Sequence, residues 1–286
     1  MRRAGGQKSN GLSDSKSDKQ PVPTGIVNAG FRCLFFTPPG QAGTRMGMSD
    51  IRYKRILLKL SGESFCKPDG FGIDGEALEA IADRIIRICK LGPQVAIVVG
   101  GGNFLRGPSF SRKSHIPRTT ADYMGMLATV INACALQEIL EKEGQPTRVL
   151  SAIEVSAICE PFIRRRAIRH LERGRVTILA GGTGNPFFST DTCAALRAAE
   201  LGAELMIKAT KVDGVYTDDP KTNPNAQLIE RMTYHQVLQQ NLKVMDPSAV
   251  SLCWENHIPI VVLNFFRDGH ITKALRGEQV GTLISD

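Results

Sequence analysis

Beyond residue 50, the hydrophobic positions alternate between short continuous apolar runs and a stretch with helical spacing. The runs 55–60 (RILLKL) and 95–99 (VAIVV) each predict a strand, and apolar residues at 78, 81, 85 and 88 mark one face of a helix between them. Nearly unbroken apolar strands are typical of parallel sheets that are covered on both faces. This part of the chain therefore predicts a β-α-β unit.

The alternation continues to the end of the chain. It predicts helices near 119–143, 161–173 and 191–201, two short helices after residue 230, and strands at 148–150, 176–180, 205–208, 260–263 and 282–284. Strands that alternate with helices favour an α/β fold, a three-layer αβα sandwich with a mainly parallel central sheet. Such sheets bind ligands at the carboxyl ends of their strands, so the loops that follow strands are the places to look for chemistry.

The first 50 residues have a different composition from the rest. They contain 8 Gly, 4 Pro and 5 Ser and show neither helical nor strand periodicity. We expect a disordered basic extension over 1–50 and one folded domain over 51–286. The extension is either an arm for an anionic partner or, the favoured interpretation, an unstructured segment before Met46 and Met48.

Composition excludes several classes of protein. Hydrophobic residues make up 42% of the 286 positions and charged residues 22%, which is the globular range. The apolar runs are far shorter than the roughly 18 residues of a membrane span. Seven scattered cysteines without a C-x-x-C motif are typical of reduced thiols, so we expect a cytoplasmic protein. Residues 51–286 carry 29 Lys and Arg against 25 Asp and Glu, an imbalance too small to indicate nucleic acid binding.

Four loops that follow predicted strands carry the candidate chemistry. They are 59–63 (KLSGE), 100–103 (GGGN) with Arg106 beyond it, 181–191 (GGTGNPFFSTD) and 208–220 (KATKVDGVYTDDP). Glycine lets backbone N–H groups approach an anion closely, and a helix start adds unpaired N–H groups. Lys59 and Arg106 would add full positive charges. Phosphate is the ligand that this combination predicts.

Two familiar phosphate-binding motifs are excluded. The chain has no Gly-Lys dipeptide and hence no P-loop, and the pattern that starts at Gly100 has Leu105 where a dinucleotide fingerprint has its third glycine. The H-R-D and D-F-G elements of protein kinases are also missing from the sequence. One glycine-rich loop would be weak support, but four at the same edge of one sheet favour a phosphate site.

Five segments together resemble the uridylate kinase family, a branch of the amino acid kinase superfamily. They are 59–63 (KLSGE), 100–103 (GGGN), 122–129 (DYMGMLAT), 183–191 (TGNPFFSTD) and 208–216 (KATKVDGVY). The resemblance runs from about Tyr53 to the end of the chain. The G-N-P-F-F and D-x-M-G-M blocks are specific to the uridylate branch, whereas kinases of aspartate, acetylglutamate or carbamate lack them.

The resemblance implies direct in-line transfer of the γ-phosphate of ATP to UMP, with Mg²⁺ bound to the ATP. It implies catalytic roles for Lys59, Arg106 and Asp191. The ATP-binding residues that it implies are Lys59, Leu60, Ser61, Gly62, Gly102, Arg106, Thr210, Tyr216 and Asp219. The UMP-binding residues that it implies are Gly101, Asp122, Thr183, Gly184, Asn185, Pro186, Phe187, Phe188, Ser189 and Thr190, with Ser189 at a position where Thr is usual.

Two of these carboxylates have a second interpretation. Asp191 either orients catalytic cations or caps the helix that follows, and Asp122 either accepts hydrogen bonds from the ribose or caps its own helix. Two alternative functions also stay open at this point. One is an amino acid kinase that acts on a carboxylate or carbamate, and the other is a nucleotide-binding regulator without turnover.

Regulation and assembly are implied by the resemblance alone. Arg148 and Arg175 match positions linked to activation by GTP, and UTP is the corresponding inhibitor. The family also implies a homohexamer. The arginine run at 164–166 and the residues beyond it are interpreted as a solvated helix face, and the segment 115–117 has no assigned role.

Overall fold

The computed structural model describes residues 51–286, apart from 69, 106, 114, 221 and 241–243. The predicted extension over 1–50 and the predicted catalytic residue Arg106 lie outside the described residues.

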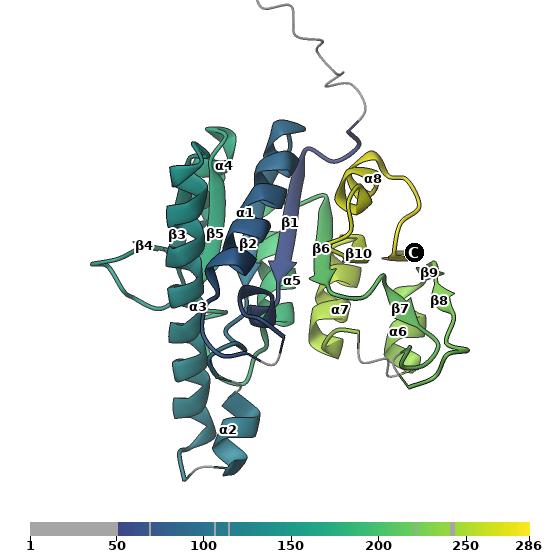
Figure 1. Ribbon diagram of the computed structural model, residues 1–286, viewed down its shortest axis with the longest axis horizontal. Coiled ribbons are helices and arrows are strands. Elements are labelled where there is room, and N and C mark those ends of the chain that lie inside the picture. Colours follow the sequence, from purple (N-terminus) through teal and green to yellow (C-terminus); the bar gives the residue numbers. More distant parts are fainter. Residues whose placement is uncertain (1–50, 69, 106, 114, 221, 241–243) are drawn as a thin grey trace, which may run out of the picture. The chain divides into compact units, whose positions relative to one another are not determined.

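A nine-stranded sheet forms the centre of the fold, with the strand order β4-β3-β5-β2-β1-β6-β10-β11-β9 (Figure 1). Its strands are β1 (Arg55–Leu60), β2 (Gln94–Val99), β3 (Thr147–Ser151), β4 (Glu160–Pro161), β5 (Val176–Ala180), β6 (Leu205–Thr210), β9 (Arg231–Met232), β10 (Ile260–Asn264) and β11 (Thr282–Ile284). The seven strands from β4 to β10 in that order are parallel, and β11 pairs antiparallel with β10. The prediction of a mainly parallel sheet is confirmed.

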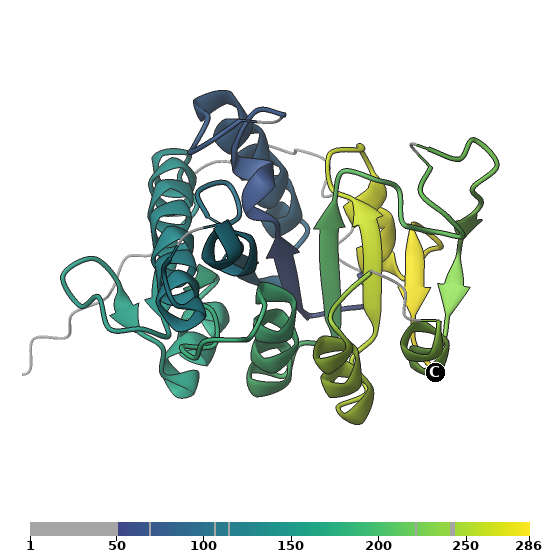
Figure 2. The ribbon, with the colours of Figure 1, turned by 90° about the horizontal axis from the view of Figure 1, so that it is seen from below.

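Helices cover both faces of this sheet (Figure 2). They are α1 (Gly75–Lys90), α3 (Arg118–Lys142) and α8 (His270–Arg276) on one face, and α4 (Arg164–Glu172), α5 (Thr190–Leu201), α6 (Tyr234–Gln239) and α7 (Pro247–Glu255) on the other. A short 3₁₀ helix, η1 (Gly62–Phe65), follows β1, and α2 (Gly107–Lys113) precedes α3. The predicted αβα sandwich is therefore confirmed.

The alternation of side chains along β1 and β2 shows why their sequences are mostly apolar. Ile56 and Leu58 pack into the core with α1 and α3, whereas Leu57 packs into the core with α5. In β2, Ile97 and Val98 divide between the two cores in the same way. Both faces of these strands are buried, so nearly all of their positions carry apolar side chains.

Several short elements differ from the prediction. The helix expected over 161–173 begins only at Arg164, because Glu160 and Pro161 pair with the end of β3. The strands β7 (Val215–Tyr216) and β8 (Leu228–Ile229) form a separate antiparallel pair that was not predicted. Two-residue strands are too short to produce a period that a sequence can display.

Helix α3 combines a long apolar composition with a place in the core. Among the described helices, it has the length and hydropathy of a membrane span. Its residues Val130, Ala133, Leu136 and Leu140 are buried against the sheet and α1. Core packing accounts for the composition, and a membrane span is not supported.

Candidate active site

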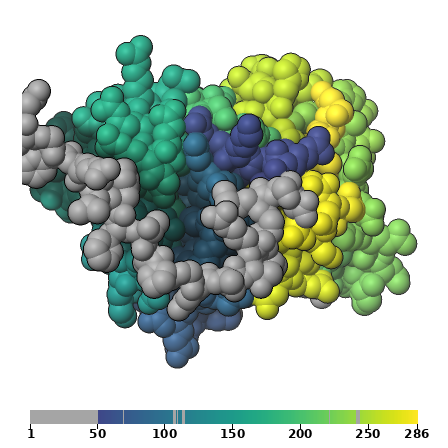
Figure 3. All heavy atoms as spheres, turned by 90° about the horizontal axis from the view of Figure 1, so that it is seen from above, coloured from purple at the N-terminus to yellow at the C-terminus, as the bar shows by residue number. Residues whose placement is uncertain are grey.

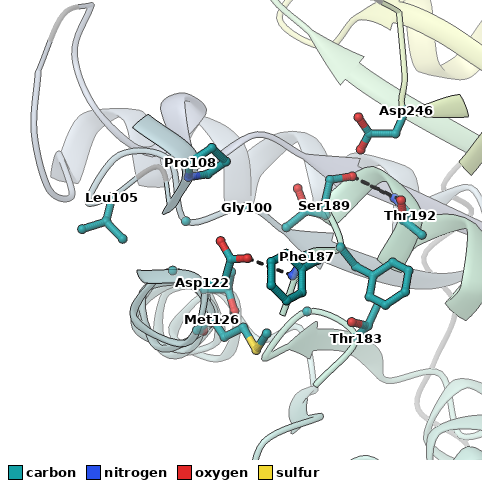
Figure 4. A pocket seen from close by; sticks show the side chains of 18 of the residues that line it. Gly100, Leu105, Pro108, Asp122, Met126, Thr183, Phe187, Ser189, Thr192 and Asp246 are labelled. Carbon is teal, nitrogen blue, oxygen red and sulfur yellow. Dashed lines mark hydrogen bonds between the residues drawn. The ribbon is translucent and has the colours of Figure 1, made fainter. Parts of the chain in front are cut away.

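A cavity of about 680 Å³ opens at the carboxyl edge of the sheet, beside β1, β2 and β5 (Figure 4). Its lining includes many of the residues that the sequence predicts, namely Ser61, Gly62, Gly101, Gly102, Asp122, Thr183, Phe187, Phe188, Ser189 and Thr190. The loops after three parallel strands therefore meet there, as expected for an α/β sheet.

The glycines of these loops allow a very close approach of backbone segments. A Cβ atom at Gly62 would lie 2.4 Å from the Gly102 nitrogen, and one at Gly101 would lie 2.6 Å from the Gly125 oxygen of α3. The turns after β1 and β2 thus touch each other and α3 through backbone atoms. Leu60 is fully buried in the core and does not line the cavity.

An ionic cluster lies at the ends of β1 and β6, next to the cavity. The Lys59 Nζ lies 2.8 Å from one carboxylate oxygen of Asp191, and the Lys208 Nζ lies 2.7 Å from the other. Lys59 and Lys208 are register partners on adjacent parallel strands, so they approach the same carboxylate. The Lys208 ammonium also donates to the Val244 carbonyl oxygen. All three side chains of the cluster are largely buried.

Burial and charge act in opposite directions on this cluster. Burial raises the pKa of Asp191, but the Lys59 and Lys208 ammonium groups outweigh it and hold that pKa below its usual value. Burial lowers the pKa of Lys208, and Asp191 opposes that change. A buried carboxylate between two cations stays ionised, and it holds the two ammonium groups close together at the sheet edge.

The capping interpretation of Asp191 is wrong. The N-cap of α5 is Ser189, whose Oγ accepts hydrogen bonds from the Asp191 N–H at 3.1 Å and the Thr192 N–H at 3.2 Å. Asp191 lies inside the first turn, so its carboxylate is left to face the two lysines. The hydroxyl at Ser189 therefore has a structural role, which a Thr hydroxyl could also fill.

The capping interpretation of Asp122 is also wrong. The N-cap of α3 is Pro117, the last residue of the segment 115–117, and Asp122 lies one turn inside the helix. Its carboxylate receives the Arg118 Nε–H at 2.8 Å and the backbone N–H of Phe187 at 2.8 Å. Figure 4 shows the contact between Asp122 and Phe187 across the cavity.

Phe187 is held in an unusual conformation by this contact. Its φ of 72° lies in the left-handed region, which is costly for a side chain of this size. The residue is 65% exposed, and the Arg118 guanidinium carbon lies 5.5 Å from the centre of its ring. Strained residues persist where surrounding contacts fix them, often at ligand sites. Arg118 was not among the predicted site residues.

Other predicted residues lie away from the cavity lining. Thr210 ends β6, Tyr216 is in β7 and Asp219 follows it, and none of the three lines the cavity. Gly184, Asn185 and Pro186 belong to the loop after β5 but do not line the cavity. Arg148 is near the amino end of β3 and Arg175 directly precedes β5, so both lie at the opposite edge of the sheet.

The structure adds residues that the sequence analysis missed. Lys208 was noted only as part of a loop motif, although a lysine within an apolar strand is a signal comparable to Lys59. Asp246 and Ser248, at the start of α7, also line the cavity, and the Ser248 Oγ lies 2.8 Å from the Thr192 Oγ1. No sequence pattern relates α7 to the glycine loops, so Asp246 and Ser248 could not have been predicted from the sequence.

Comparison with known proteins identifies the family. The family model described as the amino acid kinase family matches residues 54–264, which span every strand that borders the cavity. The chain belongs to the amino acid kinase family. The resemblance seen in the sequence motifs is confirmed.

Several relatives of this chain are named uridylate kinases. A chloroplastic uridylate kinase of Arabidopsis thaliana is 54% identical over 82% of this chain and 69% of its own length. A uridylate kinase of Methylococcus capsulatus is 52% identical over 83% of this chain and 99% of its own length. The crystal structure of a UMP kinase from Bacillus anthracis, 40% identical, covers 82% of this chain and 96% of that chain with a TM-score of 0.79.

The buried carboxyl of Asp191 predicts a pH dependence of the protein's stability. Its folded-state pKa lies below the ordinary 3.8, so the ionised carboxylate contributes stability that is present above pH 3.8 and lost as pH falls through the folded-state pKa. We expect the wild-type protein to be more stable than Asp191→Asn at neutral pH, with the difference shrinking below 3.8. Urea unfolding of both proteins across this range measures the difference. A difference that is constant with pH would contradict the prediction.

Proposed function

We propose that this protein transfers the γ-phosphate of ATP to UMP, giving UDP and ADP. The observation that carries the proposal is the Lys59–Asp191–Lys208 cluster beside a cavity built from three glycine loops, in a chain that is more than half identical to uridylate kinases. Phosphoryl transfer needs its reactants positioned and the charge on the moving group neutralised. Two ammonium groups held by one carboxylate can supply that neutralisation.

We assign the two substrates to the two groups of residues. The part of the cavity lined by Gly101, Asp122 and residues of the loop 183–190 would hold UMP. The backbone of 59–62 and Gly102, together with Arg106, would hold the phosphates of ATP, and Thr210, Tyr216 and Asp219 would hold its adenosine. Lys59 and Lys208 then lie near the boundary between the two sites, where an in-line transfer would occur without a covalent intermediate.

A divalent cation, Mg²⁺, would accompany the ATP. Among the described residues no cluster of three or more His, Cys, Asp and Glu side chains forms a metal cage, which fits a cation held mainly by phosphate oxygens and water. Asp191 is paired with two lysines and Asp122 with Arg118, so among the described residues that line the cavity Asp246 is the carboxylate that would hold the cation. When bound, the cation would neutralise phosphate charge.

A coupled assay of ADP production tests the function. We expect turnover with ATP and UMP that clearly exceeds turnover with AMP, CMP or GMP. Turnover of aspartate, acetylglutamate or carbamate instead would favour another branch of the amino acid kinase family. Binding of nucleotides without any turnover would favour a regulator.

We further propose that the protein assembles as a homohexamer. One face of α3 that the core leaves uncovered carries large apolar side chains at helical spacing, namely Tyr123, Met124, Leu127 and Ile131. Such an apolar face supports contact with a second copy of the chain. Light scattering on the purified protein measures the mass of the assembly.

Regulation by GTP and UTP, and a cytoplasmic location, complete the proposal. Arg148 and Arg175 both lie at the sheet edge opposite the cavity. Arg148 pairs with Glu141 at 2.6 Å, and the Arg175 guanidinium lies 3.1 Å from the His170 ring. Effectors bound there would be separate from the substrates. Initial rates with added GTP or UTP test the regulation.

Cell fractionation tests the proposed cytoplasmic location. Because the Arabidopsis relative is named chloroplastic, recovery of this protein in an organelle would contradict that location.

Removal of residues 1–45 is expected to leave stability and kinase activity nearly unchanged. The described chain is already anchored at Arg52, whose backbone N–H donates to the Leu275 oxygen of α8 at 2.9 Å. Figure 3 shows the purple start of the described chain beside the yellow segment near its C-terminal end. From its composition, we expect the segment 1–50 to contribute too little apolar burial to offset its ordering entropy. Thermal melts and kinetics of the truncated protein measure both quantities. A large fall in Tm would contradict the expectation.

A further inference from the structure

Two buried asparagines join the turn after β2 to helix α3. Asn103 ends the segment 100–103 and is 3% exposed, and Asn132 lies in α3 and is fully buried. Their amides bond each other twice, with the Asn103 Nδ2 donating to the Asn132 Oδ1 at 2.9 Å and the Asn132 Nδ2 donating to the Asn103 Oδ1 at 2.7 Å. The pair lies beside apolar core residues, where unpaired amides would be costly.

The second donor of each amide reaches a backbone carbonyl. The Asn132 Nδ2 donates to the Gly100 oxygen at 2.8 Å, and the Asn103 Nδ2 donates to the Gly72 oxygen at 2.7 Å. The backbone N–H of Gly72 in turn donates to the backbone carbonyl oxygen of Asn103 at 3.0 Å. All four amide N–H bonds of the pair are therefore used, and three separate segments of the chain are fixed to one another.

The bond from Asn132 controls the direction of a backbone amide in the cavity. The Gly100 carbonyl and the Gly101 N–H belong to one trans peptide unit, in which C=O and N–H point in opposite directions. Because Asn132 holds the carbonyl toward the protein interior, the Gly101 N–H is directed away from it. Gly101 lines the cavity, as do Gly100 and Gly102.

Asn103 fixes the same turn from its other end. Its Oδ1 lies only 2.8 Å from where a Cβ atom of Gly62 would be, so it packs directly against the turn after β1. The two turns, which both line the cavity, are thus set relative to each other by one amide pair. All N–H donors of the two side-chain amides are used within this network, so neither has a donor left for a ligand.

We propose that Asn103 and Asn132 are positioning residues for UMP phosphorylation. The pair keeps the turn 100–102 in the one conformation that directs its backbone N–H groups at the substrate phosphate. The inference rests on the proposed function. Donors that are already oriented need no rearrangement as charge develops, and a misplacement of about 1 Å can cost on the order of a hundredfold in rate.

Steady-state kinetics of Asn103→Ala, Asn132→Ala and the double variant test the proposal. We expect each single substitution to lower kcat/KM for UMP by at least about tenfold. The double variant should lose less than the product of the two single losses, because the asparagines act through the bonds they share. The rise in Tm that saturating UMP produces, measured against the same variant without UMP, should shrink in parallel. If an alanine variant fails to fold, the corresponding Asn→Ser variant is measured in its place.

Thr147→Val provides a matched control for lost buried hydrogen bonding. Thr147 is fully buried in β3 at the edge opposite the cavity, and its hydroxyl donates to the Gln145 oxygen at 3.0 Å. We expect this variant to lose Tm but to keep wild-type kcat/KM and the wild-type response to UMP. Asparagine variants that behave like this control would overturn the inference while leaving the proposed function intact. A wild-type protein without activity on UMP would overturn both.

Discussion

Lys59→Ala is expected to lower kcat by about a hundredfold or more with the fold intact. The Lys59 ammonium lies at the end of β1, 2.8 Å from Asp191, where charge on the transferred phosphoryl group would develop. Its loss removes a full positive charge from a largely buried site. The fold should survive because Asp191 keeps its contact with Lys208 at 2.7 Å. Steady-state kinetics with UMP and ATP, together with a thermal melt, measure the effect.

Lys90→Ala is the control for this prediction. Lys90 ends α1 at the surface and does not line the cavity. This variant should keep the wild-type kcat, so that loss of a lysine as such is separated from loss of this lysine. Near wild-type turnover in folded Lys59→Ala would refute a role for Lys59 in phosphoryl transfer.

Asp122→Asn is expected to weaken the use of UMP far more than that of ATP. The Asp122 carboxylate faces the cavity, and a carboxylate is the acceptor that the two hydroxyls of a ribose need. Sites built to hydrogen-bond a hydroxyl strongly reject analogues that lack it, so UMP should exceed dUMP and dTMP by at least roughly tenfold in kcat/KM. Varying UMP and ATP separately, in the wild-type protein and the variant, measures both effects.

Asp83→Asn is the control for Asp122→Asn. It separates the loss of a contact with UMP from the loss of an ion pair within a helix. Asp83 and Arg87 form an (i, i+4) pair at 2.7 Å on α1, the same spacing as Arg118 and Asp122 on α3. The control should leave both substrates unaffected. Unchanged UMP parameters in Asp122→Asn would remove Asp122 from the substrate site. In that case the residue would serve only to hold Phe187 and Arg118.

The order of the longer helices and strands was predictable because a strand that is buried on both faces has a continuous apolar sequence, whereas the short helices α2 and α8 were not predicted. The strands β1, β2 and β5 all have this character, and the glycine loops that follow them could be assigned to one sheet edge for the same reason. The two-residue strands β4, β7, β8 and β9 escaped prediction because they are too short to display a period. The start of α4 at Arg164 was likewise decided by the pairing of Glu160 and Pro161 with β3.

The sequence by itself determined the sandwich, the sheet edge that carries the site and most of the residues around the cavity. Only the tertiary structure decided which of those residues act on each other. Lys59 and Lys208 meet at Asp191 because β1 and β6 are neighbours in the sheet, although they are remote in the chain. Asn103 and Asn132 meet because α3 packs over the turn after β2. Periodicity records how each segment is buried, whereas such contacts depend on the register and packing between segments, which no single segment encodes.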